Sequence, residues 1–91
     1  LVDGQVRRVV AEAAKSGRKS IAAIMSQSAF GNLAEATLRQ EAGRYGMRVV
    51  AVERFAAGGE AQSVAAIAAV ASQIDCILLP EGAGVAPTIA R

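Results

Sequence analysis

Polar side chains that could bind a small ligand gather in residues 26–31, which hold two serines, a glutamine and an aromatic–glycine pair. Hydroxyl and amide groups beside the backbone N–H groups of a helix N-terminus can bind a carboxylate or a similar anion. Ser28 has a simpler interpretation as well, because a serine at such a position caps a helix and stabilises it by about 1 kcal/mol. We therefore treat Ser26, Gln27 and Ser28 as candidate ligand-binding residues, with capping alone as the alternative for Ser28.

Four further candidates follow strands in the same way. Phe30 offers a surface on which a ligand could stack, or it tucks under the loop as a hydrophobic staple of the helix entry. Gly31 lets backbone approach a ligand closely, or simply permits the start of the helix. Glu81 would bind an ammonium or guanidinium group, although exposed loop carboxylates are usually only solvated. Gly82 begins a Gly-x-Gly segment, which on its own is a weak signal for phosphate binding.

Residues for catalysis or metal binding are scarce. The chain has a single cysteine and no histidine, which excludes an intramolecular disulfide and a zinc site of His and Cys ligands. Cys76 lacks a histidine to act as its base, so we expect it to be a small apolar core residue. Glu53, Glu60 and Glu81 could gather near strand ends, but spacing alone shows no acid–base geometry. We expect no catalytic residue, metal or cofactor, and an enzyme of flavodoxin-like or sugar-isomerase type is a minor alternative.

Composition narrows the class of partner. Ten Lys/Arg against eight Asp/Glu give a net charge of +2, and the basic residues are spread along the chain. With only three aromatic residues and no basic patch, a nucleic-acid partner is not expected. The chain contains no apolar run of the ~20 residues that span a bilayer. Leu1 opens a segment without the charged and apolar regions of a secretory signal, which leaves the compartment open.

The pattern of apolar residues predicts alternating helices and strands. Short apolar runs predict strands over residues 20–25, 48–55 and 75–80. Helical spacing predicts a helix that ends near Gly17 and a second, clearer one that ends at Gly46. A third helix is marked by Val64, Ile67, Ala68, Ala71 and Ile74, and residues 85–91 begin a fourth. The predicted order is α-β-α-β-α-β-α.

This order predicts an α/β fold, a doubly wound parallel sheet of the Rossmann-like or flavodoxin-like kind, in one lobe over residues 1–91. Three strands make a thin sheet with exposed edges, so we expect either a fragment of a larger protein or a homodimer paired through sheet edges. Ligands of such sheets bind outside the carboxyl ends of the strands. The loops at residues 26–31, 55–59 and 81–84 are therefore the expected functional surface.

Several short motifs resemble a known family. A Val-Arg-Arg-Val-Val helix precedes the strand Lys-Ser-Ile-Ala-Ala-Ile-Met, which is followed by Ser-Ala-Phe-Gly and a long helix. That helix ends in Tyr-Gly-Met-Arg-Val-Val, and an Asp-Cys-Ile-Leu-Leu strand comes later. Over essentially its whole length the chain resembles the second lobe of type I periplasmic solute-binding proteins, the branched-chain amino acid-binding type. Within that fold the likeness is strongest to the penicillin-binding protein activators.

The resemblance implies a function and a location. It implies a ligand-binding module for an amino acid or a related small polar ligand in ABC transport, closing on a first lobe to form a cleft. The alternative it implies is an envelope regulatory protein that contacts a cell-wall synthase rather than a membrane permease. The parent would be periplasmic, either exported or anchored as a lipoprotein. Phe30 stands where many members have tyrosine, and Pro80 and Glu81 depart from the glycine-rich pattern after the third strand.

Overall fold

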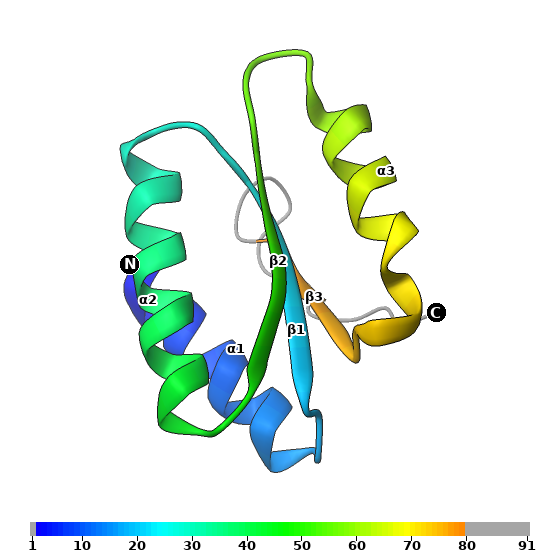
Figure 1. Cartoon of the computed structure of the whole chain (residues 1–91). Coiled ribbons are helices and arrows are strands. Elements are labelled where there is room, and N and C mark those ends of the chain that lie inside the picture. Colours follow the sequence, from blue (N-terminus) through cyan, green and yellow to red (C-terminus); the bar gives the residue numbers. More distant parts are fainter. Residues whose placement is uncertain (1, 80–91) are drawn as a thin grey trace.

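The computed structural model describes residues 2–79, which form three strands, three α-helices and one 3-10 helix (Figure 1). In chain order the elements are α1 (Val2–Lys15), β1 (Ser20–Ser26), α2 (Ala29–Arg44), β2 (Arg48–Phe55), α3 (Glu60–Ala69), the 3-10 helix η1 (Ala71–Gln73) and β3 (Cys76–Leu78). Helices alternate with strands as the sequence predicts, and the α/β fold class is confirmed.

The three strands form one parallel sheet in the order β2-β1-β3, so β1 lies in the centre. In the register of β1 with β2, Ser26 pairs with Phe55 at the carboxyl ends of the two strands. Because parallel strands end at the same edge of a sheet, the loops after β1 and β2 emerge side by side. In this order the switch point lies between β1 and β3, and open α/β sheets bind ligands outside the carboxyl ends of their strands.

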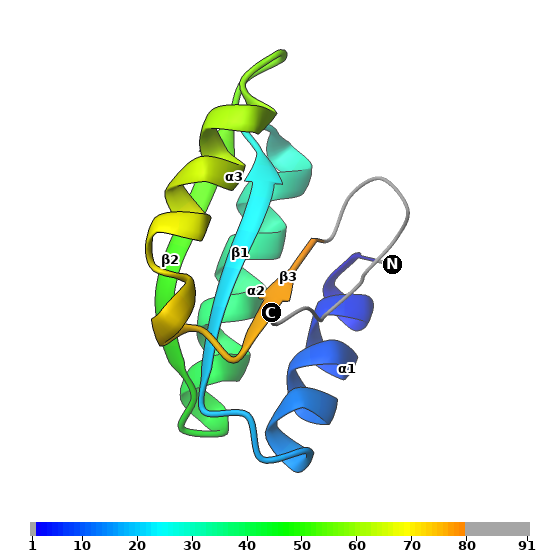
Figure 2. The same cartoon turned by 90° about the vertical axis from the view of Figure 1, so that its right-hand side faces the viewer.

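The helices cover the two faces of the sheet unequally. Helices α1 and α2 lie on one face and α3 lies on the other (Figures 1 and 2). Alternate side chains of β1 serve the two cores, as expected for a strand buried on both sides. The larger core contains Val6, Val10, Ala13, Ile21, Ala23, Met25, Ala34, Leu38, Ala42, Met47, Cys76 and Leu78. The smaller core, under α3, contains Ala22, Ile24 and Ile67.

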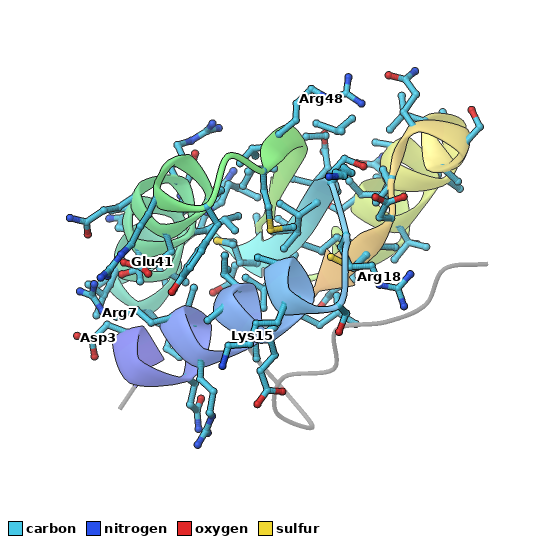
Figure 3. The ribbon with its side chains drawn as sticks, turned by 90° about the horizontal axis from the view of Figure 1, so that it is seen from below. Asp3, Arg7, Lys15, Arg18, Glu41 and Arg48 are labelled. Atoms are coloured by element: carbon cyan, nitrogen blue, oxygen red, sulfur yellow. The ribbon has the colours of Figure 1, made fainter. Side chains whose placement is uncertain are left out.

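Helices α1 and α2 are also joined by an ion pair. Glu41 of α2 is buried, and its Oε2 accepts a hydrogen bond from Arg7 Nη1 of α1 at 3.1 Å. Arg44 Nη1 lies 3.7 Å from the other carboxylate oxygen of Glu41. Two cations therefore neutralise a carboxylate that would be costly to bury alone. Figure 3 shows Arg7 and Glu41 together between the two helices.

The third helix and the third strand differ in their bounds from the sequence prediction. The third helix begins at Glu60 and ends at Ala69, before the short η1, whereas the apolar positions mark it as far as Ile74. The third strand is Cys76–Leu78, so residues 75 and 79 of the predicted 75–80 lie outside it, and Pro80 lies outside the described residues. Asp75 lies just before the strand: its backbone N–H donates to the carbonyl oxygen of Ser20 at 3.3 Å, and its carboxylate accepts a hydrogen bond from the backbone N–H of Lys19. The fourth helix predicted over residues 85–91 lies outside the described residues.

Candidate functional site

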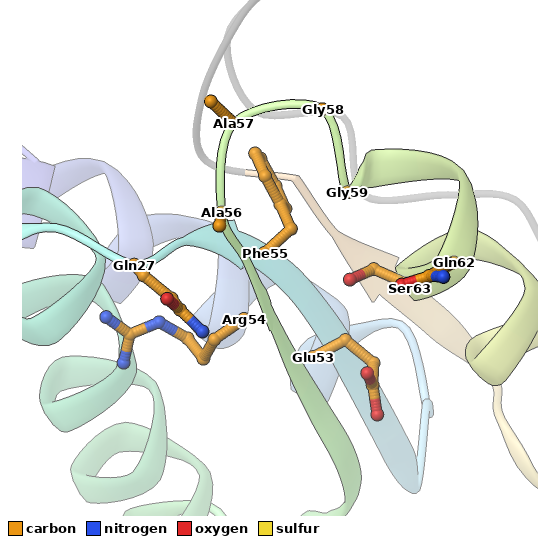
Figure 4. Close-up of a pocket in the computed structure, with 10 residues that line it drawn as sticks. All are labelled: Gln27, Glu53, Arg54, Phe55, Ala56, Ala57, Gly58, Gly59, Gln62 and Ser63. Atoms are coloured by element: carbon orange, nitrogen blue, oxygen red, sulfur yellow. The ribbon is translucent and has the colours of Figure 1, made fainter.

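A hollow of about 480 Å³ lies at the carboxyl end of the sheet, between the ends of β1 and β2 and the start of α3 (Figure 4). It lies at two of the three expected loops, residues 26–31 and 55–59. The lining residues are Gln27, Glu53, Arg54, Phe55, Ala56, Ala57, Gly58, Gly59, Gln62 and Ser63. Amide, hydroxyl, charged and aromatic groups therefore share one concave surface of a size suited to a small molecule.

Of the predicted site residues that the structure describes, Gln27 alone lines this hollow. Its backbone N–H donates to the carbonyl oxygen of Phe55 at 2.8 Å, which extends the pairing of β1 and β2 by one bond. This bond places the Gln27 side chain beside the loop of residues 56–59. Glu81 and Gly82 lie outside the described residues, and their predicted role in binding stays a prediction.

Ser28 caps helix α2. Its Oγ accepts a hydrogen bond from the backbone N–H of Gly31 at 3.1 Å, and its backbone is extended, as in most N-caps. A second hydrogen bond of 2.7 Å joins Ser28 Oγ to Ser26 Oγ. The structural role of Ser28 is thus visible, and ligand binding by Ser26 and Ser28 stays a prediction.

Phe30 and Gly31 also lie outside the hollow. Phe30 is half-buried in the first turn of α2. Gly31 is buried, and a Cβ on it would overlap the carbonyl oxygen of Ser26. Glycine is therefore required at position 31 because the first turn of α2 packs closely against the end of β1. Contact of Phe30 or Gly31 with a ligand stays a prediction.

The side chain of Arg54 ties the loop after β1 to its neighbours. Its Nε donates to the carbonyl oxygen of Ser26 at 2.9 Å, and its Nη2 donates to the Oδ1 of Asn32 at 2.7 Å. The Nη2 also approaches the carbonyl oxygen of Ser28 at 3.4 Å, and Nη1 donates to Glu35 Oε1 at 2.9 Å. The guanidinium thus uses most of its donors within the protein.

Glu35 completes this network. Its carboxylate accepts hydrogen bonds from Arg54 and, at 3.0 Å, from Arg39 Nε. The hydrogen bond from Arg54 is the main cause that holds the pKa of Glu35 below its usual value, and partial burial opposes it. A carboxylate paired in this way stays charged and neutralises the cation beside the hollow.

Sequence reasoning missed several groups that line the hollow. Glu53 is predicted only as a carboxylate near the strand ends, and Phe55 begins one of the expected loops, but Arg54, Gln62 and Ser63 are not among the predicted ligand-binding residues. The side chains of Arg54 and Glu53 point to opposite sides of β2, toward α2 and α3 respectively (Figure 4). For Glu53 and Arg54 the sequence holds a usable signal. Side chains alternate between the two faces of a strand, so the last residues of a strand that ends at the functional edge place side chains on both sides of it.

The side chains that line the hollow include two amides, a hydroxyl, two charged groups and one aromatic ring. Within residues 2–79 no group of three His, Cys, Asp or Glu side chains could hold a metal ion. Cys76 is buried in the larger core, and burial raises the pKa of its thiol. In the same part of the chain no helix is long and apolar enough to cross a membrane.

Comparisons with known proteins support the fold. No protein-family model matches the chain, and no curated protein matches it by sequence. Among solved structures, the chain is similar to a solute-binding protein of an ABC transporter from R. palustris, crystallised in complex with benzoate. The TM-score is 0.71 at 19% sequence identity, and the match covers 87% of this chain and 22% of the other. The chain therefore has the Rossmann-like fold found in a lobe of a solute-binding protein.

Proposed function

We propose that the chain is a ligand-binding module, one lobe of a solute-binding protein that recognises a small polar ligand and delivers it to an ABC transporter. The observation that carries this proposal is the hollow at the carboxyl end of β1 and β2, because ligands of open parallel sheets bind there. The likeness to a solute-binding protein supports it, and so does the mixture of amide, hydroxyl and aromatic groups in the hollow.

The proposal extends to the rest of the system. The chain corresponds to 22% of the length of the similar solute-binding protein, so a first lobe would supply the opposite wall of the cleft. The partners would be that lobe and a membrane permease, and the location would be periplasmic. The candidate ligands are amino acids and, because the similar protein was crystallised with benzoate, small aromatic carboxylates. Gln27 is the residue we expect to contact them from the loop after β1.

Nuclear magnetic resonance of the ¹⁵N-labelled chain tests this proposal. We expect amino acids or small carboxylates to shift the backbone amides of Gln27 and residues 55–59, with dissociation constants of about 1 mM or weaker. Weak binding is expected because one lobe supplies only part of the contacts and no domain closure traps the ligand. Gln27→Ala should weaken binding, whereas Gln40→Ala, at an exposed position of α2, should not.

Two results would count against the proposal. Absence of any shift in these amides at high solute concentration would remove the ligand-binding role. Micromolar affinity of the isolated chain would show that the site is complete within one lobe, which contradicts a two-lobed cleft.

A regulatory role in the envelope is the second candidate function. Phe30 does not line the hollow, and the hydroxyls of Ser26 and Ser28 bond to each other, which favours a fold kept for contact with another protein over one kept for solute recognition. A penicillin-binding protein activator would act by contacting a cell-wall synthase. Binding of such a synthase together with failure of all solutes would favour this second function.

A further inference from the structure

Ser63 is a buried residue whose hydroxyl has no hydrogen-bond partner in the described part of the chain. Only 4% of its surface is exposed, and its backbone N–H bonds to the carbonyl oxygen of Gly59 at 3.3 Å. Its side chain lines the hollow and projects from α3 toward β2 (Figure 4). Buried hydroxyls nearly always have a partner, and those without one call for an explanation. An acceptor bound in the hollow would provide the missing partner.

The start of α3 presents further donors to the same space. The helix has ten residues, and its N-cap Gly59 makes no side-chain capping bond. The backbone N–H groups of Glu60, Ala61 and Gln62 have no acceptor among residues 2–79, as expected for the first turn of a helix without a side-chain cap. Together with the helix dipole, these groups favour a negatively charged oxygen.

We propose that the first turn of α3 and the Ser63 hydroxyl form a carboxylate subsite, and that the Phe55 side chain contacts the apolar part of the same ligand. The ligand class is a small organic carboxylate with an apolar body. This inference rests on the proposal that the hollow binds a solute, and it names the group of that solute that is recognised. It places recognition of the carboxylate at the first turn of α3, while Gln27 contacts the ligand from the loop after β1.

The charged side chains around this subsite decide which groups bind the anion and which repel it. The Arg54 guanidinium already donates hydrogen bonds to Glu35, Asn32 and the carbonyl oxygen at the end of β1. The anion is therefore recognised by the backbone N–H groups of the first turn of α3 and by the Ser63 hydroxyl. Glu53 lines the hollow from the side of β2 that faces α3, and its carboxylate repels a bound anion. Glu60 stands exposed in the first turn of α3 and adds to that repulsion. Removing the charge of Glu53 should therefore strengthen binding.

The experiment compares phenylacetate with its uncharged counterpart phenylacetamide, using the ¹⁵N-labelled full chain. We expect phenylacetate to shift the amides of residues 60–63, and phenylacetamide to bind at least about tenfold more weakly because it lacks the charge. Acetate and inorganic phosphate distinguish the anion from the apolar body as the source of affinity. Both should bind more weakly than phenylacetate if Phe55 contributes.

Variants test the roles of individual side chains. Ser63→Ala should weaken phenylacetate binding about tenfold, the loss expected for a hydrogen bond to a charged group. Without ligand its denaturation midpoint should stay unchanged or rise, because an unpartnered buried hydroxyl is removed. Ser72→Ala, at an exposed position in η1, is the matched control and should change neither property. Glu53→Gln should strengthen binding about threefold by removing a like charge.

Each contrary result has a distinct meaning. Shifts confined to residues 26–31 would leave the solute-binding function standing and overturn the carboxylate subsite. Equal binding of phenylacetate and phenylacetamide would also overturn the subsite. A lower denaturation midpoint for ligand-free Ser63→Ala would show that the hydroxyl has a structural partner, and would overturn the inference as well. Failure of amino acids and carboxylates alike to bind anywhere would contradict both this inference and the proposed function.

Discussion

Arg54 at the end of β2 donates a hydrogen bond of 2.9 Å to Glu35 on α2, and thereby fastens an edge strand to the helix that follows the central strand. Both side chains are largely shielded, with 21% and 26% of their surfaces exposed, so water screens the pair only in part. The same guanidinium holds the carbonyl oxygen of Ser26. The geometry of the loop after β1 therefore depends on a residue of β2.

Replacing Arg54 tests this dependence. Arg54→Met should lower the free energy of unfolding by about 2 kcal/mol, because it removes charge-assisted hydrogen bonds to groups that are partly shielded from water. The amide resonances of residues 26–32 should shift with it. Arg39→Met is the matched control, since Arg39 is more exposed and within residues 2–79 its side chain bonds only to Glu35. Urea denaturation measures both losses, and equal losses for the two variants would contradict the role given to Arg54.

The Glu35 carboxyl predicts a dependence of stability on pH. Its pKa is lowered in the folded chain, mainly by the hydrogen bond from Arg54, so the unfolded chain binds its proton more readily. The stability from Glu35 is therefore fully present above its ordinary value of 4.5 and is lost as the pH falls through the lower folded pKa.

Glu35→Gln should remove this part of the acid destabilisation. The free energy of unfolding of the variant should fall less steeply than that of the parent chain as the pH drops below 4.5. Denaturation curves between neutral pH and about pH 3 measure the difference. Parallel curves for the two proteins would show that Glu35 titrates with the same pKa in both states.

Gly31 should not tolerate a side chain. Gly31→Ala would place a Cβ against the carbonyl oxygen of Ser26, which is backbone and cannot move without disturbing β1. We expect a loss of about 2 to 4 kcal/mol in the free energy of unfolding. Gly43→Ala, later in the same helix, meets no atom within 4 Å and should stabilise the chain by about 0.5 to 1 kcal/mol. Thermal denaturation distinguishes these opposite signs.

The Arg7–Glu41 pair predicts unequal effects of two neighbouring arginines on α1. Arg7→Gln should lower the free energy of unfolding by about 1 kcal/mol, a value reduced because half of Arg7 faces water although Glu41 is buried. Arg8→Gln should have almost no effect, because Arg8 is exposed and makes no ion pair within residues 2–79. Equal losses in urea denaturation would argue against the pair as a link between the helices.

Much of the fold could be predicted from the sequence because the apolar runs are short and well separated. The strand predicted over residues 48–55 has those bounds in the structure, and β1 extends the predicted 20–25 by one residue. Helix α3 was harder, since its many alanines give little contrast between faces. Its first turn holds Glu60 and Gln62, which helical periodicity of apolar residues does not mark.

The candidate site was predictable only as a set of loops. The rule that ligands bind at the carboxyl ends of parallel strands identified residues 26–31 and 55–59, and Gln27 connects both. It did not identify Arg54 or Ser63, because their positions depend on which strands are neighbours and on where α3 begins. Spacing along the chain contains neither piece of information. Ser28 marks the start of α2 in the sequence, whereas α3 begins after Gly59, which has no side chain to cap it.

The central position of β1 has a consequence for how the chain moves. It is the one strand of residues 2–79 paired on both sides, so its amides should exchange with solvent last, after those of β2 and β3. Ser26 ends this slow strand, whereas residues 56–59 follow an edge strand. We therefore expect the two sides of the hollow to differ in mobility, with the backbone at the end of β1 moving less than residues 56–59.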